Sequence, residues 1–135
     1  MPSAQSDLSL ILWATDIPRF STFLVEVCGM TVVQQHPGFA ELDLNGAAIL
    51  LHDDESYRGH PWYDALRREG LARGVGTELR LRVEDLDGRY TRALRLGGIA
   101  VQAPADVEGS RECQVMGPDG YLLSLLQRGA PTPLA

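Results

Sequence analysis

The pattern of apolar and polar positions predicts that the chain begins with a strand followed by a helix. Residues 8–14 form a dense apolar run that is short enough for a buried strand. Asp16 can cap the helix, Pro18 suits its first turn, and Gly29 ends it. The apolar side chains of one helical stripe are Phe20, Phe23, Leu24 and Val27.

Three further strands are predicted in the same half of the chain, at residues 30–35, 39–44 and 47–52. Asn45-Gly46 separates the last two, and this pair is a strong signal for a tight hairpin turn. The first half therefore predicts the order strand, helix, strand, strand, strand.

The second half repeats this order. Residues 78–83 alternate charged and apolar side chains, which is typical of a half-buried strand. Asp85 or Asp87 opens a helix that ends at Gly97-Gly98, and its predicted buried face carries Tyr90, Ala93 and Leu94. Three strands follow at residues 99–102, 111–116 and 121–126. The helix-opening residues Asp16 and Asp85 lie 69 positions apart in a chain of 135, which indicates an internal duplication of an α+β module.

We predict one domain with module one at residues 7–53 and module two at residues 77–128. Residues 54–76 are interpreted as a linker with a short helix around residues 61–69. An alternative is a lid, because Trp62 and Tyr63 lie beside His60 and could cover a ligand. The Pro-rich tail at residues 129–135 is expected to fray.

Composition narrows the class of protein. A content of 44% hydrophobic and 22% charged residues is ordinary for a soluble globular chain, and no apolar run approaches the ~20 residues of a membrane span. The net charge of −6 argues against a nucleic-acid partner. The first residues lack the basic flank of a secretory signal, and two cysteines do not suggest a disulfide framework. We expect a cytoplasmic protein without a membrane partner.

Three features carry a resemblance to a known family. They are the paired strand–helix–three-strand halves, the stretch Val83-Glu84-Asp85-Leu86-Asp87 before a helix that ends in Gly-Gly, and the closing stretch Gly117-Pro118-Asp119-Gly120-Tyr121-Leu122-Leu123-Ser124-Leu125. Across residues 8–127 the chain resembles the vicinal oxygen chelate superfamily, which includes glyoxalase I, extradiol dioxygenases, fosfomycin-resistance enzymes and bleomycin-resistance proteins. The resemblance implies an α+β fold in which two repeated βαβββ modules form a cup-shaped mixed sheet. It also implies a homodimer.

The resemblance also locates the positions that hold a metal in the metalloenzymes of this superfamily. In this chain those positions carry Ser9, Leu50, Glu78 and Ser124, and only Glu78 has a ligand side chain. A catalytic divalent metal normally takes three or more His, Asp, Glu or Cys ligands. We therefore predict no metal and no other cofactor. An irregular site stays open as an alternative, with candidate ligands His36, Glu41, His52 and His60.

Alternation along the strands predicts which side chains line the cup. Ser9, Ile11 and Trp13 share one face of the first strand, whereas Leu8, Leu10 and Leu12 are predicted to pack under the helix. Glu78 and Arg80 face inward from the matching strand of the second half. The predicted ligand-binding residues are Ser9, Ile11, Trp13, Leu50, His52, Glu78, Arg80 and Ser124.

Each of these residue types also has a purely structural interpretation. Trp13 is either a core residue or a pocket wall. Arg80 either pairs with a neighbouring carboxylate or contacts the ligand, and His52 either ends a strand at the surface or reaches the cavity. Cys28 and Cys113 are interpreted as small apolar fillers.

The sequence thus favours a metal-independent small-molecule binding protein that resembles the bleomycin-resistance proteins and holds an aromatic or amphipathic ligand. Sequestration requires affinity and no bond breaking, so it tolerates the loss of metal ligands. The alternative is an enzyme of the same superfamily, a lyase, isomerase or dioxygenase. Such an enzyme would use an atypical metal site, or Glu78 as a general base enclosed by apolar walls. A regulator or degenerate scaffold without a ligand is a third possibility.

Overall fold

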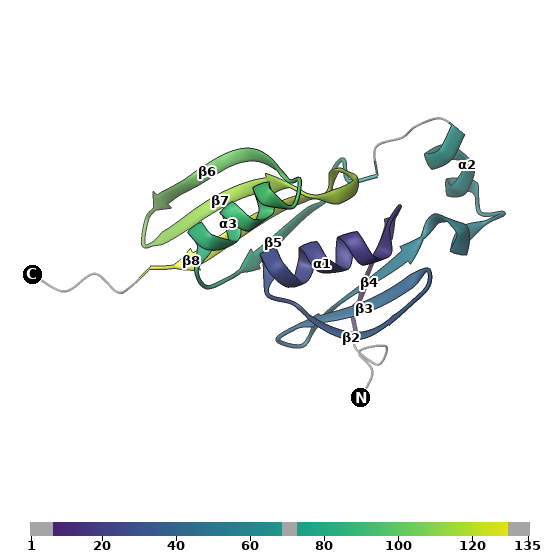
Figure 1. The fold of residues 1–135 in the computed structure, drawn as a ribbon, viewed down its shortest axis with the longest axis horizontal. Helices are drawn as coiled ribbons and strands as arrows, with labels where there is room; N and C mark the ends of the chain where they lie inside the picture. The colour runs from purple at the N-terminus through teal and green to yellow at the C-terminus, as the bar shows by residue number, and fades with distance from the viewer. Residues whose placement is uncertain (1–6, 69–72, 130–135) are drawn as a thin grey trace, which may run out of the picture.

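The computed structural model describes residues 7–68 and 73–129, so most of the predicted C-terminal tail lies outside the described residues. Two βαβββ modules follow each other along the chain (Figure 1). The first contains β1 (Leu10–Ala14), α1 (Ile17–Cys28), β2 (Thr31–His36), β3 (Phe39–Leu44) and β4 (Ala47–Asp53). The second contains β5 (Glu78–Arg82), α3 (Leu86–Arg95), β6 (Ile99–Val107), β7 (Ser110–Met116), the short turn η3 (Pro118–Gly120) and β8 (Leu122–Arg128). The predicted α+β fold of two repeated modules is confirmed.

Each module forms its own four-stranded mixed sheet. The strand orders are β1-β4-β3-β2 and β5-β8-β7-β6, so β1 and β5 hold equivalent edge positions. Each edge strand runs parallel to its neighbour, with Ile11 opposite Leu50 in the first sheet and Arg80 opposite Ser124 in the second. The remaining pairs are antiparallel. The internal repeat therefore holds at the level of strand register.

Local sequence signals explain how α1 and its neighbours form. The Asp16 side chain accepts a hydrogen bond from the Arg19 amide at 3.1 Å, which caps the helix. Gly29 adopts a left-handed conformation (φ 74°) and ends it. The stripe predicted from the sequence is fully buried against the first sheet. The Asn45-Gly46 pair has two positive φ values, 51° and 93°, as a tight hairpin turn requires.

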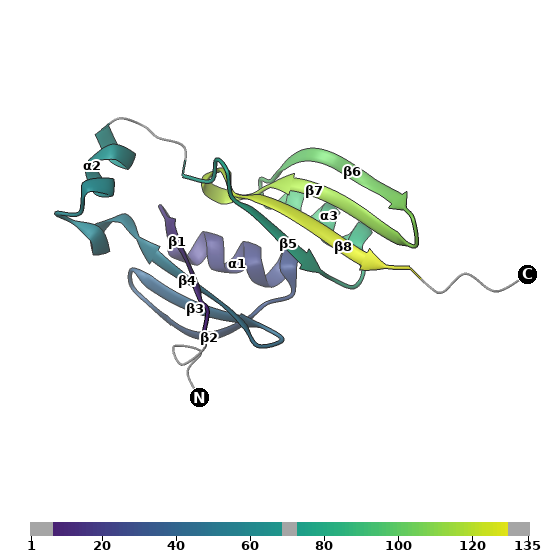
Figure 2. The same ribbon diagram turned by 180° about the vertical axis from the view of Figure 1, so that it is seen from behind.

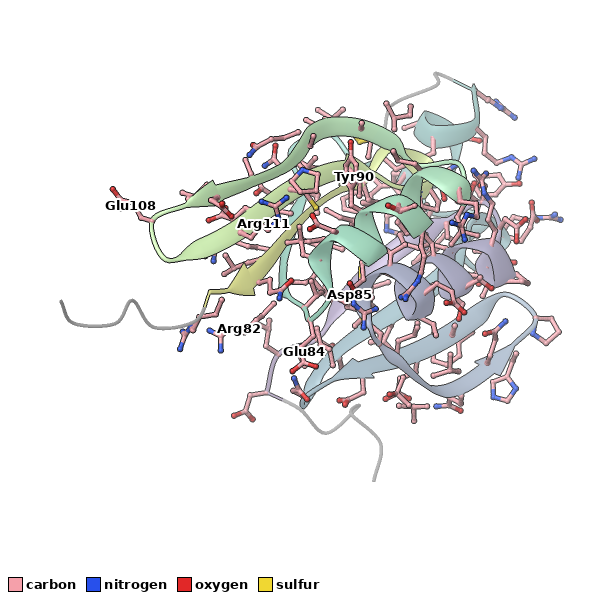
Figure 3. The ribbon with its side chains drawn as sticks, turned by 60° about the vertical axis from the view of Figure 1, so that its left-hand side comes forward. Arg82, Glu84, Asp85, Tyr90, Glu108 and Arg111 are labelled. Carbon is pink, nitrogen blue, oxygen red and sulfur yellow. The ribbon has the colours of Figure 1, made fainter. Side chains whose placement is uncertain are left out.

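Two predictions about burial are wrong. Leu8 and Leu10 do not pack under α1, because β1 begins only at Leu10 and its first residues lie at the rim of the sheet, exposed by 85% and 39%. On α3, Leu94 is 40% exposed, and Leu86 takes its place in the core beside Ala93. Tyr90 packs against that core from α3 (Figure 3).

The two modules pack through their helices, with α1 beside α3. Each helix covers one face of its own sheet, and the opposite faces of both sheets look to the same side of the molecule with no helix over them (Figure 2). Arg111 on β7, labelled in Figure 3, pairs with Asp87 of α3 and with Asp106 of β6 at the surface of the second module. Strand alternation in the sequence predicts the ligand site on these uncovered faces.

A linker joins the modules and carries the turn η2 (Asp54–Tyr57) and the helix α2 (Pro61–Arg68). The predicted linker helix is therefore present. It stands at one end of the molecule, beyond the end of β4 (Figure 1).

Candidate functional site

The structure divides the eight predicted ligand-binding residues into separate groups. Ile11 and Trp13 line one cavity along β1, and Arg80 lines a different one with the Asn45 turn. Glu78 and Ser124 bond to each other on the second sheet. The other three lie on or beside the first sheet: Leu50 and His52 half-buried on β4, and Ser9 exposed just before β1. Among the described residues, no single enclosed cup brings all eight together.

The most apolar cavity runs along β1 and has a volume of about 360 Å³. Its walls come from β1, from α2, from the end of the linker before β5 and from the turn before β8. The residues that line it are Leu10, Ile11, Leu12, Trp13, Trp62, Ala65, Leu66, Arg73, Thr77 and Tyr121. A cavity of this size and apolar character suits a small organic ligand.

Trp13 and Trp62, which line this cavity, belong to a cluster of stacked and tilted rings. Trp13 stacks on Tyr57 with ring centroids 3.7 Å apart and planes inclined by 14°. His60 meets Trp13 edge-on at 5.5 Å, and Trp62 lies 5.7 Å from Trp13 at a tilt of 52°. Trp13 is only 7% exposed, yet it borders the cavity. Both interpretations of Trp13, core residue and pocket wall, therefore hold.

His52 extends the same group of rings across the sheet. Its Nδ1 lies 2.8 Å from the Tyr57 hydroxyl, and its ring lies beside Phe39. Burial lowers the pKa of His52, which the neighbouring Asp53 carboxylate partly opposes. Burial also raises the pKa of Tyr57. The neutral imidazole can thus accept a hydrogen bond from the Tyr57 hydroxyl, which helps to hold Tyr57 against Trp13.

A polar clamp holds the linker against both modules beside the cavity. Arg73 donates to both carboxylate oxygens of Asp54, with 2.8 Å between Nη2 and Oδ2. Its Nε lies 4.0 Å from Asp119, which in turn accepts hydrogen bonds from the amide and hydroxyl of Thr15. The clamp therefore joins the linker, the start of α1 and the turn before β8.

A second polar group lies on the uncovered face of the second sheet. The Ser124 hydroxyl donates to Glu78 Oε2 at 2.6 Å and accepts from Gln114 Nε2 at 2.9 Å. Ser124 is buried, whereas Glu78 is exposed. Glu78 thus bonds to serine rather than to Arg80, and apolar walls do not enclose it.

The donor set does not fit a catalytic metal. The four family positions offer one carboxylate, two hydroxyls and the aliphatic Leu50, which cannot compensate a divalent charge. Across residues 7–68 and 73–129, no three His, Cys, Asp or Glu side chains gather closely enough to hold a metal ion.

The two cysteines are buried and free. Burial raises the pKa of Cys28 to about 12 and that of Cys113 to about 11, so neither forms a thiolate near neutral pH. They offer no nucleophile to the site.

Several residues of the cavity escaped the sequence analysis. Leu66, Arg73 and Tyr121 line it from outside the strands whose alternation guided the prediction, and Tyr57 stacks on the wall residue Trp13. Trp62 was noted as a possible lid residue, and it does face the cavity. A cluster of aromatic residues after the fourth strand was the available signal for Tyr57.

In the described part of the chain, no helix is long and apolar enough to span a membrane.

Comparison with known proteins supports the fold. No protein-family model and no curated protein sequence matches the chain. Among solved structures, it is similar to a glyoxalase/bleomycin resistance protein/dioxygenase family enzyme from Burkholderia phytofirmans, with a TM-score of 0.71 and 19% identity over 89% of this chain and 96% of that one. A glyoxalase-related enzyme from Fulvimarina pelagi gives a TM-score of 0.69 and 17% identity over 97% and 99%. A glyoxalase/bleomycin resistance protein/dioxygenase from Nocardioides gives 0.64 and 22% over 100% and 93%. The resemblance to the vicinal oxygen chelate superfamily is thereby confirmed at the level of the fold: this chain has the two-module fold of the glyoxalase/bleomycin-resistance/dioxygenase proteins.

Proposed function

We propose that this chain is a cytoplasmic, metal-independent protein that binds an aromatic or amphipathic small molecule, as the bleomycin-resistance proteins of this fold are expected to do. One observation carries the proposal: a cavity of about 360 Å³ along β1 is lined mostly by apolar side chains and includes two tryptophans. Burying apolar ligand surface in such a cavity supplies affinity of roughly 25 cal/mol per Å² before the costs of association. Ligand binding breaks no covalent bond, so the shortage of metal-ligating side chains does not prevent it.

Ile11 offers the sharpest test of this site. It lines the cavity but is 45% exposed, so a change there alters the wall without opening the core. A panel of aromatic compounds should raise the melting temperature of the wild type, and Ile11→Glu should remove that rise because the carboxylate would have to be desolvated. Ile99→Glu is the matched control: Ile99 is 65% exposed on β6, away from the cavity. If no compound stabilises the wild type, or if Ile11→Glu responds like the control, the proposal fails.

We also propose that the protein is a homodimer. Within the described residues, the outer edges of β1 and β5 pair with no strand. Unpaired strand edges beside apolar side chains are surfaces that association covers. Light scattering coupled to size-exclusion chromatography should give twice the mass of 14.8 kDa. A monomer at micromolar concentration would reject this part of the proposal.

An enzyme that uses Glu78 as a general base is the second candidate, and the hydrogen bond from Ser124 is the observation in its favour. The exposure of Glu78 counts against it, because the enclosure by apolar walls that the mechanism requires is not present in one chain. Turnover of any substrate that Glu78→Gln abolishes, with an unchanged melting temperature, would favour this candidate over simple binding.

A further inference from the structure

The helix α2 presents an apolar face that is only half covered. Trp62, Ala65 and Leu66 occupy positions i, i+3 and i+4, and all three line the cavity along β1. The other face carries charged residues such as Asp64 and Arg68. No residue of α2 is buried, and Trp62 is 62% exposed. Trp62 therefore lines the cavity while much of its ring is in contact with water, and a ligand can cover that apolar surface.

The attachment of α2 is local. Its main contact is with the preceding turn η2, where Glu55 accepts hydrogen bonds from Tyr63 and Arg67, both at 3.0 Å. Before the helix, Gly59 has a φ of 92°, and because glycine has no side chain its backbone can change conformation there at low steric cost. Both hydrogen bonds are solvent-exposed, so moving the helix by a small amount breaks no buried hydrogen bond of this pair.

The two tryptophans are nearly placed to sandwich a flat ring. Their centroids are 5.7 Å apart, and their planes are tilted by 52°. A third ring stacked between two others needs parallel planes about 7 Å apart, twice the contact distance of carbon atoms. Trp13 is fixed by its stack on Tyr57, so the adjustment falls to Trp62 and α2.

The cavity also restricts the charge of its occupant. Among the described residues that line the cavity, Arg73 is the only charged one. Its guanidinium already donates hydrogen bonds to Asp54 and lies near Asp119. A charged ligand would therefore lose water without gaining a partner, which is costly.

We infer that α2 is a hinged lid and that Trp62 is the residue that selects a neutral, planar, fused-ring ligand by stacking it against Trp13. This inference rests on the proposed function and names its ligand class. An aliphatic molecule of similar volume fills the same cavity but gains nothing from stacking.

Nile red, a neutral planar dye, and dodecan-1-ol, a flexible aliphatic alcohol, separate the two kinds of binding. Fluorescence titration measures Nile red, and competition measures the alcohol. Trp62→Ala should weaken Nile red by about tenfold, because the dye loses ring stacking as well as buried area, whereas the alcohol loses buried area alone. Trp62→Phe should recover most of the affinity, and the alcohol should change by less than about threefold. The control is Arg68→Ala on the same helix, where the side chain is 80% exposed. Hydrogen exchange of α2 amides should slow when Nile red binds.

Each outcome decides one claim. If Nile red binds wild type and Trp62→Ala equally, the selecting role of Trp62 is rejected while the proposed function stands. An equal loss of dye and alcohol rejects stacking as the basis of selection. Unchanged exchange in α2 during tight binding rejects the lid. If neither probe binds the wild type, the proposed function itself fails.

Discussion

The Tyr121 hydroxyl donates a buried hydrogen bond of 2.8 Å to the backbone carbonyl of Trp13. These residues are 108 positions apart, in different modules, and the bond holds the stacking wall of the cavity to the turn before β8. Burial raises the pKa of Tyr121 to about 12, so the phenol remains a donor across the working pH range of the protein. The cavity wall is therefore fixed from both modules.

Tyr121→Phe removes this donor and leaves the Trp13 carbonyl without the hydrogen bond from the phenol. We expect a loss of about 1–2 kcal/mol in the free energy of unfolding, the usual cost of an unsatisfied buried acceptor. Urea denaturation measures it, and Tyr90→Phe on the second module serves as the control because its ring is only partly buried. Equal stability of wild type and Tyr121→Phe would show that the bond contributes nothing.

The Arg73–Asp54 clamp gives a second prediction. Their side chains are only 13% and 9% exposed, so removing the guanidinium leaves a carboxylate in a poorly solvated place. Arg73→Met should lower the free energy of unfolding by about 2 kcal/mol. Arg68→Met should change it by less than about 0.5 kcal/mol, because the Arg68–Asp64 pair is exposed. The double change Arg73→Met with Asp54→Leu should recover part of the loss, and a further loss would contradict this account.

The lowered pKa of His52 predicts that the free energy of unfolding depends on pH. Burial holds its pKa below the ordinary value of 6.5, so below that pH the native protein binds fewer protons than the unfolded chain. Its contribution to stability is therefore full above pH 6.5 and is lost as pH falls through the lowered pKa. His52→Gln should flatten the curve of unfolding free energy between about pH 5 and 7. The exposed His36→Gln is the control, and identical slopes in both variants would exclude His52 as the cause.

The cysteines predict resistance to thiol reagents. Because burial raises the pKa of both Cys28 and Cys113, neither should react with an aromatic disulfide reagent in the folded protein near pH 8. Both should react after denaturation, giving two thiols per chain. Rapid reaction of either in the native state would mean that its surroundings open easily.

Local signals predicted most elements because they act over a few residues. Residues 39–44 were expected as a strand, and β3 has those bounds. The buried face of α3 is harder to predict from the sequence. Leu86 and Ala93, seven positions apart, are its buried residues, and such sparse spacing does not show which side Leu94 takes.

The site was predicted less well than the fold. Strand alternation identified Trp13 and Ile11 as wall residues, and both line the cavity. It could not show that Tyr57 stacks on Trp13 or that Tyr121 bonds to it, because these contacts depend on how η2 and the turn before β8 approach β1.

The sequence by itself determined the duplicated module, the helix ends and the poor donor set at the family's metal positions, since each depends on residue type and spacing. Only the tertiary structure decided which predicted residues share a cavity. Glu78 and Ser124 meet on the second sheet, whereas Trp13 and Trp62 meet 49 positions apart beside the first. These contacts depend on how the two modules and the linker pack against one another. The periodicity of apolar residues within one strand does not predict that packing.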